Sequence, residues 1–507
     1  MLTYSLGRTG SLTLYEELYR CIRQDILDGT ISPGDRLPSK RSLAKNLSIS
    51  TITVEHAYGM LLDEGYIYSI PKKGYFAADL TLTTCRRKSC KTAPDCRQTA
   101  EHLSGSDSDS GSDASETKNC FADFTAGRTN PDRFPLSTWV RLMREIIHDR
   151  KKELMISSPP GGIRELREAI CEYLYQFRGI RALPEQVIVG AGTEYLYSLL
   201  IQLLGRDRIY ALETPGYPKI PRIYARNDAV CRYIPMDSRG ISVSALRECD
   251  ADILHLSPSH HFPTGIVTPV QRRYELLSWA SESEERYIIE DDYDSEFRLS
   301  GRPIPSMQSI DPTGKVIYIN TFTKSLASTI RISYMILPPS LMRRFRSELG
   351  FYSCTVSNFE QYTLSRFLKE GYFEKHINRM RKYYRNQRDV ILRCIRRNPR
   401  SYGMRITGED AGLHFLLHVP SFCSDSRLVI RARRMGIHIS ALSEYEFRPE
   451  QQNSDAGFFS AGVPLHALVL SYSGVPPEIL PQAVDRLIRA VSDSRFLRRR
   501  DSPEKLL

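Results

Sequence analysis

The sequence predicts an α/β body, with a mostly parallel sheet covered by helices, that follows a small helical head ending in a β-hairpin. Strand-like and helical runs alternate from about residue 121 onward, which favours a parallel sheet. The N-terminal part instead carries a helical apolar repeat, and a run poor in apolar residues separates the two. We therefore expect a head at residues 1–78, a flexible linker at 79–120 and a body at 121–507, whose small C-terminal α+β subdomain covers about 360–507.

The head has the pattern of three helices followed by a hairpin. Apolar residues recur every four positions from Leu14 to Ile22, which places them on one face of a helix. Ser39 and Ser50 are good N-caps for two short helices separated by a tight break, the pattern of a helix-turn-helix. Two strand-like runs then flank residues 71–74, a hairpin tip with two lysines that would form a wing.

Composition and charge limit the class of protein. The chain has 507 residues, of which 41% are hydrophobic, enough for a sizeable core. Its net charge of +11 favours a polyanion such as nucleic acid as a partner. No run approaches the roughly 18–20 apolar residues that span a bilayer. Because the N-terminus also lacks a signal-peptide pattern, we expect a cytoplasmic protein with no membrane partner.

The 11 cysteines indicate reduced thiols rather than a disulfide framework. Their number is odd, and no CxxC pair occurs. Cys85, Cys90 and Cys96 lie closest together, but their spacing is too loose for a zinc knuckle. We therefore expect no metal.

Chemistry-bearing residues follow two of the predicted strands of the body. Asp291 ends the run YIIED, and Tyr293 lies two residues beyond it. Lys324 follows the run KVIYINTFT, and Arg331 lies seven residues further on. A lysine with a lowered pKa can form an imine with an aldehyde, a carboxylate can keep a pyridine nitrogen protonated, and an arginine can bind a phosphate. Pyridoxal 5'-phosphate needs these three anchors together, so the sequence predicts this cofactor at the carboxyl ends of the strands.

The head resembles the GntR-type winged-helix DNA-binding domain in the strings LYEELYRCIRQDILDGTISPGDRLPSKRSLAKNLSIS and TVEHAYGMLLDEGYI. The resemblance implies a double-stranded DNA operator, with the recognition helix in the major groove and the wing at the minor groove. It assigns DNA contacts to Ser39, Lys40, Arg41, Ser50, Thr51, Thr53, Lys73 and Gly74. One departure is Thr51, which replaces the usual arginine and removes a guanidinium that could bind guanine.

The body resembles the fold-type I aminotransferases, and its combination with the head resembles the MocR subfamily of GntR-type regulators. The matching strings are GGIRELREAICEYL, VIVGAGTEYLYSLL, ALETPGYPKIPRIY, SPSHHFPTGIVTP, YIIEDDYDSEF and TFTKSLASTIRISYMILP. The resemblance implies that Lys324 forms the Schiff base and Asp291 holds the pyridine nitrogen. It implies further that Tyr293 donates to the phenolic oxygen and that Tyr217 stacks on the ring.

The same resemblance assigns a cradle for the phosphate and a loop beside the ring edge. The helix dipole and free backbone N–H groups would take part in the cradle. The cradle residues are Gly192, Thr193, Glu194, Thr321, Thr323 and Arg331. The loop residue is His260 or His261.

The departures from the aminotransferases concern the substrate rather than the cofactor. Val469 occupies the slot where relatives use an arginine for the substrate carboxylate, and Lys219 is the only nearby cation in the sequence pattern. Residues 156–160 replace a string that supplies an aromatic side chain in relatives. A standard α-amino-acid transaminase is therefore not expected.

Three functions remain open, and they differ in the role of the body. We expect a DNA-binding transcriptional regulator whose body senses pyridoxal phosphate, alone or with an amine or amino-acid effector. One alternative is an active aminotransferase with an accessory DNA-binding domain, so whether the chain is an enzyme stays open. The other is a regulator that responds to a different ligand. A homodimer is implied, because relatives build the cofactor site at a subunit interface.

The positive charge does not lie in the head. Residues 1–80 hold nine basic and nine acidic residues, whereas residues 341–400 hold 15 basic and five acidic residues, a net of +10. This basic stretch is either a solvated helix face or a surface that holds DNA beside the heads. The second interpretation would involve Arg379, Arg381 and Lys382.

Overall fold

In the computed structural model the chain forms two compact units, Met1–Gly111 and Ser112–Leu507, and each is described by itself. The structure describes residues 4, 13–71, 73–78, 120–125, 127, 129–299, 304–410, 412–447, 459–460 and 463–492. Nearly all of the predicted linker, the three clustered cysteines and Lys72 lie outside these residues. Within the described part of the chain, no helix is long and apolar enough to cross a bilayer.

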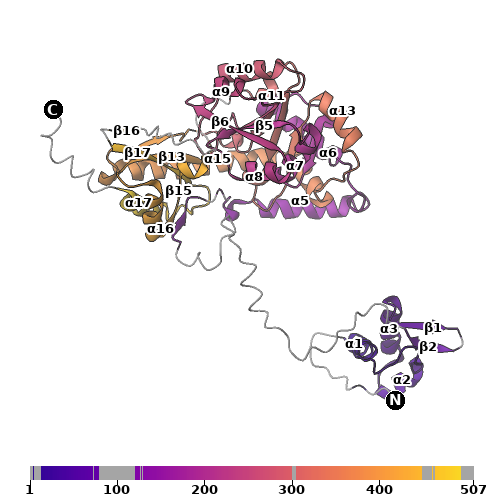
Figure 1. The fold of residues 1–507 in the computed structure, drawn as a ribbon. Coiled ribbons are helices and arrows are strands. Elements are labelled where there is room, and N and C mark those ends of the chain that lie inside the picture. Colours follow the sequence, from indigo (N-terminus) through magenta and orange to yellow (C-terminus); the bar gives the residue numbers. More distant parts are fainter. Residues whose placement is uncertain are drawn as a thin grey trace, which may run out of the picture. The chain divides into compact units, whose positions relative to one another are not determined.

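The head consists of three helices and a two-stranded antiparallel sheet (Figure 1). These elements are α1 (Leu14–Leu27), α2 (Lys40–Leu47), α3 (Thr51–Asp63), β1 (Ile67–Ile70) and β2 (Gly74–Ala77). The predicted caps are confirmed: Ser39 accepts a hydrogen bond from the Ser42 N–H, and Ser50 accepts one from the Thr53 N–H. The expected helix-turn-helix and wing hairpin are both present.

An eight-stranded sheet forms the centre of the body, in the order β4-β11-β10-β9-β8-β5-β6-β7. Neighbouring strands from β10 to β6 are parallel, whereas β11 and β7 run antiparallel to their neighbours. The strands are β4 (Val187–Gly190), β5 (Ile209–Thr214), β6 (Val230–Asp237), β7 (Gly240–Ile241), β8 (Ile253–Leu256), β9 (Tyr287–Asp292), β10 (Val316–Thr321) and β11 (Ser333–Ile336). The predicted mostly parallel sheet is confirmed.

Helices cover both faces of this sheet (Figure 1). Successive strand residues point to opposite faces, so Ile288 packs in a cluster with α10 while Ile289 packs in a cluster with α7. The helices of the body are α5 (Leu136–Asp149), α6 (Arg164–Arg178), α7 (Thr193–Leu204), α8 (Lys219–Arg226), α9 (Val243–Arg247), α10 (Val270–Ser281), α11 (Met307–Ile310), α12 (Phe322–Ser325), α13 (Pro339–Glu348), α14 (Asn358–Lys369), α15 (Tyr372–Arg397), α16 (Asp425–Arg434) and α17 (Leu480–Val491).

The C-terminal subdomain is built on a second, antiparallel sheet in the order β12-β13-β17-β15. Its strands are β12 (Arg405–Thr407), β13 (His414–Pro420), β15 (Ser440–Ala441), β16 (Phe459–Ser460), which pairs with β17, and β17 (Val463–Ser471). A short strand from the start of the body, β3 (Ala122–Asp123), pairs with β14 (Ile437–His438) of this subdomain. The predicted C-terminal subdomain, residues 360–507, does not include β3. A strand of only two residues leaves no recognisable pattern in the sequence.

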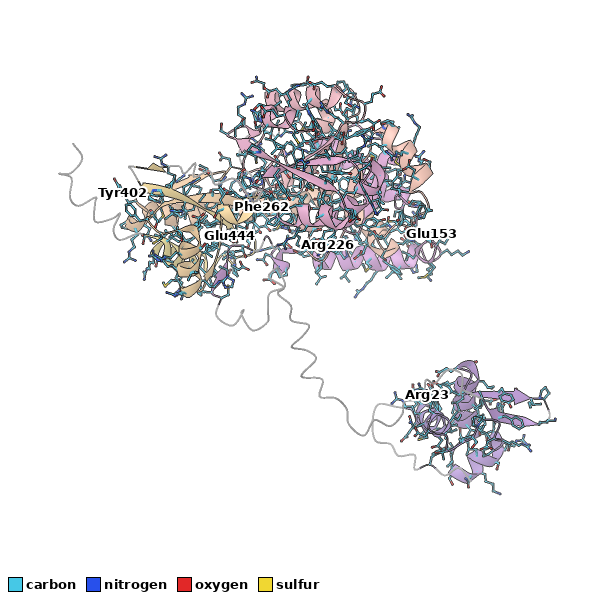
Figure 2. The ribbon with its side chains drawn as sticks, in the orientation of Figure 1. Arg23, Glu153, Arg226, Phe262, Tyr402 and Glu444 are labelled. Carbon is cyan, nitrogen blue, oxygen red and sulfur yellow. The ribbon has the colours of Figure 1, made fainter. Side chains whose placement is uncertain are left out.

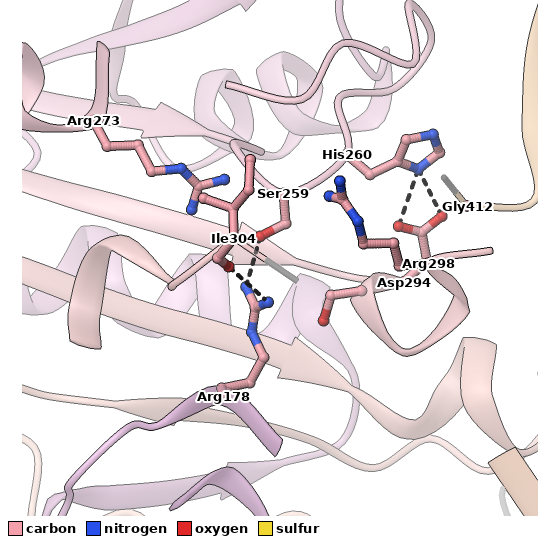
Figure 3. Close-up of a pocket in the computed structure, with 9 residues that line it drawn as sticks. Arg178, Ser259, His260, Arg273, Asp294, Arg298, Ile304 and Gly412 are labelled. Atoms are coloured by element: carbon pink, nitrogen blue, oxygen red, sulfur yellow. Dashed lines mark hydrogen bonds and ion pairs between the residues drawn. The ribbon is translucent and has the colours of Figure 1, made fainter. Parts of the chain in front are cut away.

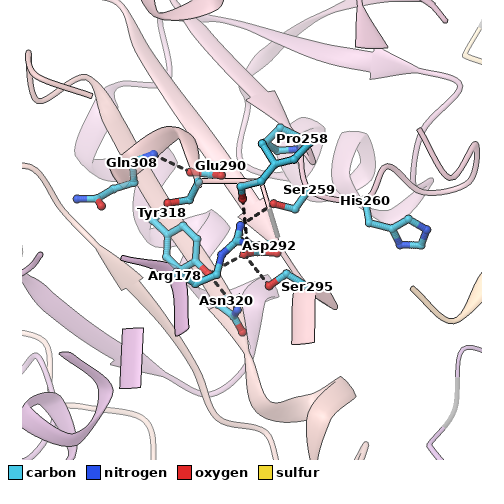
Figure 4. A network of polar contacts seen from close by, with 12 residues as sticks. Arg178, Pro258, Ser259, His260, Glu290, Asp292, Ser295, Gln308, Tyr318 and Asn320 are labelled. Atoms are coloured by element: carbon cyan, nitrogen blue, oxygen red, sulfur yellow. Dashed lines mark hydrogen bonds and ion pairs between the residues drawn. The ribbon is translucent and has the colours of Figure 1, made fainter. Parts of the chain in front are cut away.

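A buried ion pair fixes the end of β9 to the end of α6. The Arg178 guanidinium lies 3.0 Å from Asp292 Oδ2 and donates to the Ser259 hydroxyl at 2.7 Å, and both charged side chains are almost fully buried (Figure 4). Asp292 also accepts hydrogen bonds from Tyr318 and Ser295. A buried charge is tolerated when it is paired and hydrogen-bonded, so this network holds β9 and the Ser259 loop in place.

We predict that Arg178→Met destabilises the body by about 3–5 kcal/mol, because it leaves the Asp292 carboxylate buried without its partner. Arg164→Met is the matched control on the same helix, since Arg164 is exposed and its ion pair is with the half-exposed Glu168. The control is expected to cost less than about 1 kcal/mol. Urea unfolding of both variants measures the difference, and equal losses would show that the Arg178 pair is not a structural anchor.

Candidate cofactor site and DNA-binding surface

The predicted site residues of the body gather at one edge of the eight-stranded sheet. Asp291 lies at the carboxyl end of β9, and Lys324 lies on α12, directly after β10. Gly192 follows β4, and Tyr217 follows β5. Because the carboxyl ends of parallel strands share one edge, the topology brings together residues that are far apart in sequence.

Asp291 presents one free oxygen at this edge. Its carboxylate is 6% exposed, and Oδ2 accepts a hydrogen bond from the Tyr197 hydroxyl at 2.6 Å. His255 Nε2 lies 3.6 Å from the same oxygen. Oδ1 is buried and has no hydrogen-bond partner among the described residues. A buried carboxylate oxygen without a donor is costly, so the site is suited to a ligand that supplies an N–H group.

Lys324 is half-buried beside Gly127. Its Nζ donates to the Gly127 carbonyl at 2.5 Å, and a Cβ at Gly127 would fall 2.5 Å from Nζ. Burial lowers the pKa of Lys324, the negative charge of Asp294 opposes that shift, and the positive charge of Lys219 adds to it. A lysine with a lowered pKa has a larger neutral fraction, which is the form that attacks a carbonyl.

The proposed phosphate cradle lies at the N-terminus of α7. Gly192 has a φ of +92° and offers no side-chain cap, and a Cβ there would fall 2.5 Å from Arg331 Nη2. The N-cap residue therefore supplies no side chain for the first-turn N–H groups, and Arg331 lies against this residue. Glu194 lies 3.7 Å from Arg331 and 3.5 Å from Lys219, so its carboxylate sits between the two cations.

The hydroxyl groups of Thr321 and Thr323 are used within the chain. Thr321 caps α12, accepting from the Thr323 N–H, and its hydroxyl donates to Thr323 Oγ1. The Thr323 hydroxyl in turn donates to the Ile330 carbonyl at 3.2 Å. These contacts shape the turn that carries Lys324, so both threonines have a structural role in addition to the predicted one.

Tyr293 and His260 lie together with Asp294. His260 Nδ1 is 2.9 Å from Asp294 Oδ2 (Figure 3). The same nitrogen is 3.2 Å from the Tyr293 hydroxyl. If His260 donates its Nδ1–H to Asp294, the Tyr293 hydroxyl hydrogen is free for another acceptor. Gly412 borders this cluster, and a Cβ there would fall 1.9 Å from the His260 ring.

One buried group of side chains has the composition of a metal site. Potential ligand atoms of His260, Asp294 and His414 lie within 4.8 Å of one another. Two of these three residues, His260 and Asp294, are already hydrogen-bonded to each other. We therefore interpret the group as a hydrogen-bond network.

Aromatic side chains form the wall between the large sheet and the C-terminal subdomain. The Phe262 ring makes edge contacts with Tyr217, His414 and Tyr445, with centroid distances of 5.8, 5.0 and 5.2 Å. Figure 2 shows Phe262 near Glu444, where the two parts of the body meet. Tyr217 is 44% exposed, so part of this side chain remains accessible.

Five of the eight predicted DNA contacts in the head are exposed, and two of these five cap helices. Arg41, Thr51 and Lys73 are exposed, as are Ser39 and Ser50, whose hydroxyls cap α2 and α3. Lys40 Nζ, in contrast, is 2.7 Å from Glu55 on α3. The Ser50 hydroxyl caps α3 and lies 3.0 Å from Thr53 Oγ1.

The predicted wing contact, Gly74, has a φ of +111° and begins β2. An ideal Cβ at this position would lie 3.5 Å from Arg36 Nε. A residue other than glycine would therefore be strained here. Arg36 is a cation that the sequence did not single out.

Several site residues were missed from the sequence because their roles depend on packing. Tyr197 lies one helical turn after Thr193, so helix periodicity could have placed it beside the cradle. Gly127 and His414 carried no such signal, since each meets the site from another element of the fold. Asp294 directly follows Tyr293 in the turn after β9, so its place in that string could have marked it.

Comparison with known proteins agrees with this architecture. The family model described as "Bacterial regulatory proteins, gntR family" matches residues 14–76, and "Aminotransferase class I and II" matches residues 124–453. The chain is 39% identical to the uncharacterized HTH-type transcriptional regulator YdeL of Bacillus subtilis, covering 91% of this chain and 96% of that protein. It is 30% identical to the probable rhizopine catabolism regulatory protein MocR of Rhizobium meliloti, covering 95% and 94%.

Among solved structures, the fold is similar to that of the kynurenine aminotransferase of Pyrococcus horikoshii in complex with PMP. The TM-score is 0.63 at 22% identity, covering 82% of this chain and 98% of that chain. Head and body together define a transcriptional regulator with a GntR-type helix-turn-helix and an aminotransferase-like domain. The chain belongs to the MocR subfamily of GntR-type regulators, which confirms the resemblance noted in its motifs.

A buried carboxyl group at the same edge makes the stability of the body depend on pH. Burial raises the pKa of Glu213 from 4.5 to about 8, with a smaller contribution from Asp291, while the Ser257 N–H opposes the shift. Between pH 4.5 and about pH 8, Glu213 is deprotonated in the unfolded chain but keeps its proton in the folded chain. The contribution of Glu213 to the free energy of unfolding is therefore largest below pH 4.5 and is lost as the pH rises to about 8.

We predict that Glu213→Gln, which stays neutral, stabilises the body relative to wild type on the order of 2–4 kcal/mol at pH ~8 and hardly at pH ~4.5. Glu172→Gln, at an exposed position, is the control. It is expected to leave the free energy of unfolding unchanged at both pH values. Urea unfolding at both pH values measures the effect. A constant difference between Glu213→Gln and wild type at the two pH values would contradict a buried neutral carboxyl.

Proposed function

We propose that the body binds pyridoxal 5'-phosphate through a Schiff base at Lys324 and that this occupancy controls DNA binding by the head. The observation that carries the proposal is the free, buried Oδ1 of Asp291 at the same sheet edge as Lys324. A protonated pyridine nitrogen would give that oxygen the donor it lacks. The negative charge of Asp291 would in turn keep the nitrogen protonated.

The environment of Arg331 supports the phosphate end of this proposal. Backbone N–H groups of Thr193 and Glu194, with Arg331, would hold the phosphate at the N-terminus of α7, where the helix dipole favours an anion. Only glycine at position 192 leaves room for the Arg331 guanidinium. A phosphate bound here would displace the Glu194 carboxylate from its position between Arg331 and Lys219. Glu194 would therefore contribute its backbone N–H group rather than its side chain.

The remaining residues would orient the bound group and control its protons. The cofactor supplies an electrophilic aldehyde carbon and an electron-withdrawing ring. Tyr293 would donate to the phenolic oxygen, and Asp294 would keep His260 in the tautomer that leaves this hydroxyl free. Tyr217 would cover one ring face, and the neutral fraction of Lys324 would form the imine.

We propose a regulatory rather than a metabolic role, with pyridoxal phosphate, alone or with an amine or amino acid, as the signal. The GntR-type head has no use in a metabolic transaminase. Val469 is buried between β13 and β15, so a carboxylate-binding arginine is absent from that slot. Steady turnover of an amino donor and a keto acid, at rates of about 1–1,000 per second, would instead favour an active aminotransferase.

We propose further that the functional form is a homodimer located in the cytoplasm. Met155, Ile156 and Phe351 are among the most exposed large apolar side chains of the body, at 74%, 64% and 76%. Covering such side chains with a second copy would remove apolar surface from water. Sedimentation of the full chain would show a single monomeric species if this proposal is wrong.

We predict that the purified protein incubated with pyridoxal phosphate gains an absorption band at about 410–430 nm. Lys324→Ala is expected to abolish the band, because it removes the amine that forms the imine. Lys382→Ala, which removes an exposed lysine of α15, is the control that should retain it. A wild-type protein that stays colourless, or a Lys324→Ala protein that keeps the band after dialysis, would refute cofactor binding at this lysine.

We predict that Arg41→Ala abolishes the specific footprint on DNA upstream of the protein's own gene, because it removes an exposed cation at the start of α2. Lys73→Ala is expected to weaken binding to all sequences equally and to lower the salt slope by roughly one unit, as expected for a lost phosphate contact. Lys152→Ala, in the body, serves as the control. Unchanged footprints for both head variants would exclude the assigned contacts.

A further inference from the structure

Ile52 is the most exposed large apolar side chain among the described residues of the head. It is 64% exposed, whereas Val54 and Leu61 of the same helix are fully buried. Single exposed apolar residues are common on protein surfaces, so exposure alone defines no site. Ile52, however, is the second residue of α3, the recognition helix of a helix-turn-helix, where side chains face base edges.

The polar groups of the same helical turn are largely committed within the head. Ser50 and Thr53 bond to each other and to the helix N-terminus. Glu55, the first charged residue of α3, pairs with Lys40 of α2. Ile52 and Thr51 are therefore the exposed side chains that the first turn leaves for contact with DNA, and neither carries a charge or an amide.

The position of Ile52 is held by contacts that cross the head. The Lys40–Glu55 pair joins α2 to α3, and Lys40 Nζ also lies 5.7 Å from the ring centre of Tyr75 on β2. The head also carries exposed cations at Arg41, Lys45 and Lys73, which suits contact with a phosphate backbone. The N-terminus of α3 is thus presented in a fixed orientation.

We infer that Ile52 reads the C5 methyl group of a thymine in the major groove of the operator. An aliphatic side chain has one apolar partner on the base edges of that groove, the thymine methyl. This contact takes the place of the guanine contact that the absent arginine at position 51 would make. The inference rests on the proposed DNA binding by the head and adds the base that the head selects.

Replacing thymine with deoxyuridine tests the inference, because it removes only the methyl group. Duplexes bound by the full-length protein are first selected from a random library, and each thymine of the recovered site is then replaced singly. Wild type is expected to bind about fourfold more weakly at one thymine per half-site, the factor for one buried methyl-sized group. Ile52→Ala should bind the thymine and deoxyuridine duplexes equally, and Ile52→Val should keep part of the preference.

The outcomes separate this inference from the function on which it rests. Leu14→Ala, at another exposed aliphatic residue of the head, is the matched control and should keep the full thymine preference. Failure to recover any preferred duplex would overturn DNA binding itself. Recovery of a site at which no deoxyuridine weakens wild type, or at which Ile52→Ala keeps the same sensitivity, would overturn the role of Ile52 alone.

Discussion

The buried Arg178–Asp292 pair is the constraint on which the candidate site depends. Neighbouring side chains of a strand point to opposite faces, so fixing Asp292 toward α6 turns Asp291 toward α7 and Tyr197. The same guanidinium bonds to Ser259, next to His260. One ion pair therefore sets the orientation of a carboxylate on β9 and the position of the loop that carries the histidine.

The fold and the sheet edge were predictable because both follow from periodicity. Alternating strand and helix runs predicted the parallel sheet, and residues that follow such strands must meet at one edge, as Asp291 and Lys324 do. Contacts between elements were not predictable, because spacing does not encode packing. Gly127 meets Lys324 across 197 positions, and Lys40, which the motif assigned to DNA, pairs with Glu55.

Some arginines of the basic stretch of residues 341–400 are engaged within the body. Arg381 donates to the Glu296 carbonyl, and Arg385 donates to the Leu299 carbonyl. Arg366 pairs with three carboxylates of neighbouring turns and helices. These arginines stabilise the packing of α14 and α15, whereas most basic residues of the stretch, Arg379 and Lys382 among them, are exposed. This exposure is what both interpretations require, a solvated helix face and a surface that holds DNA.

The site lies where two sheets of the body meet, and this placement bears on control. Phe262, from the large sheet, contacts His414 and Tyr445 of the C-terminal subdomain, and the backbones of Gly265 and Gly408 approach too closely for a Cβ at either residue. A ligand shifts an equilibrium only by its difference in affinity for the two states. A molecule held by Asp291 and Lys324 alone would contact one side of this junction. A molecule that also reached His414 would contact both sides. Its affinity would then depend on the relative position of the two sheets, which is the condition for a ligand to shift the protein between two conformations.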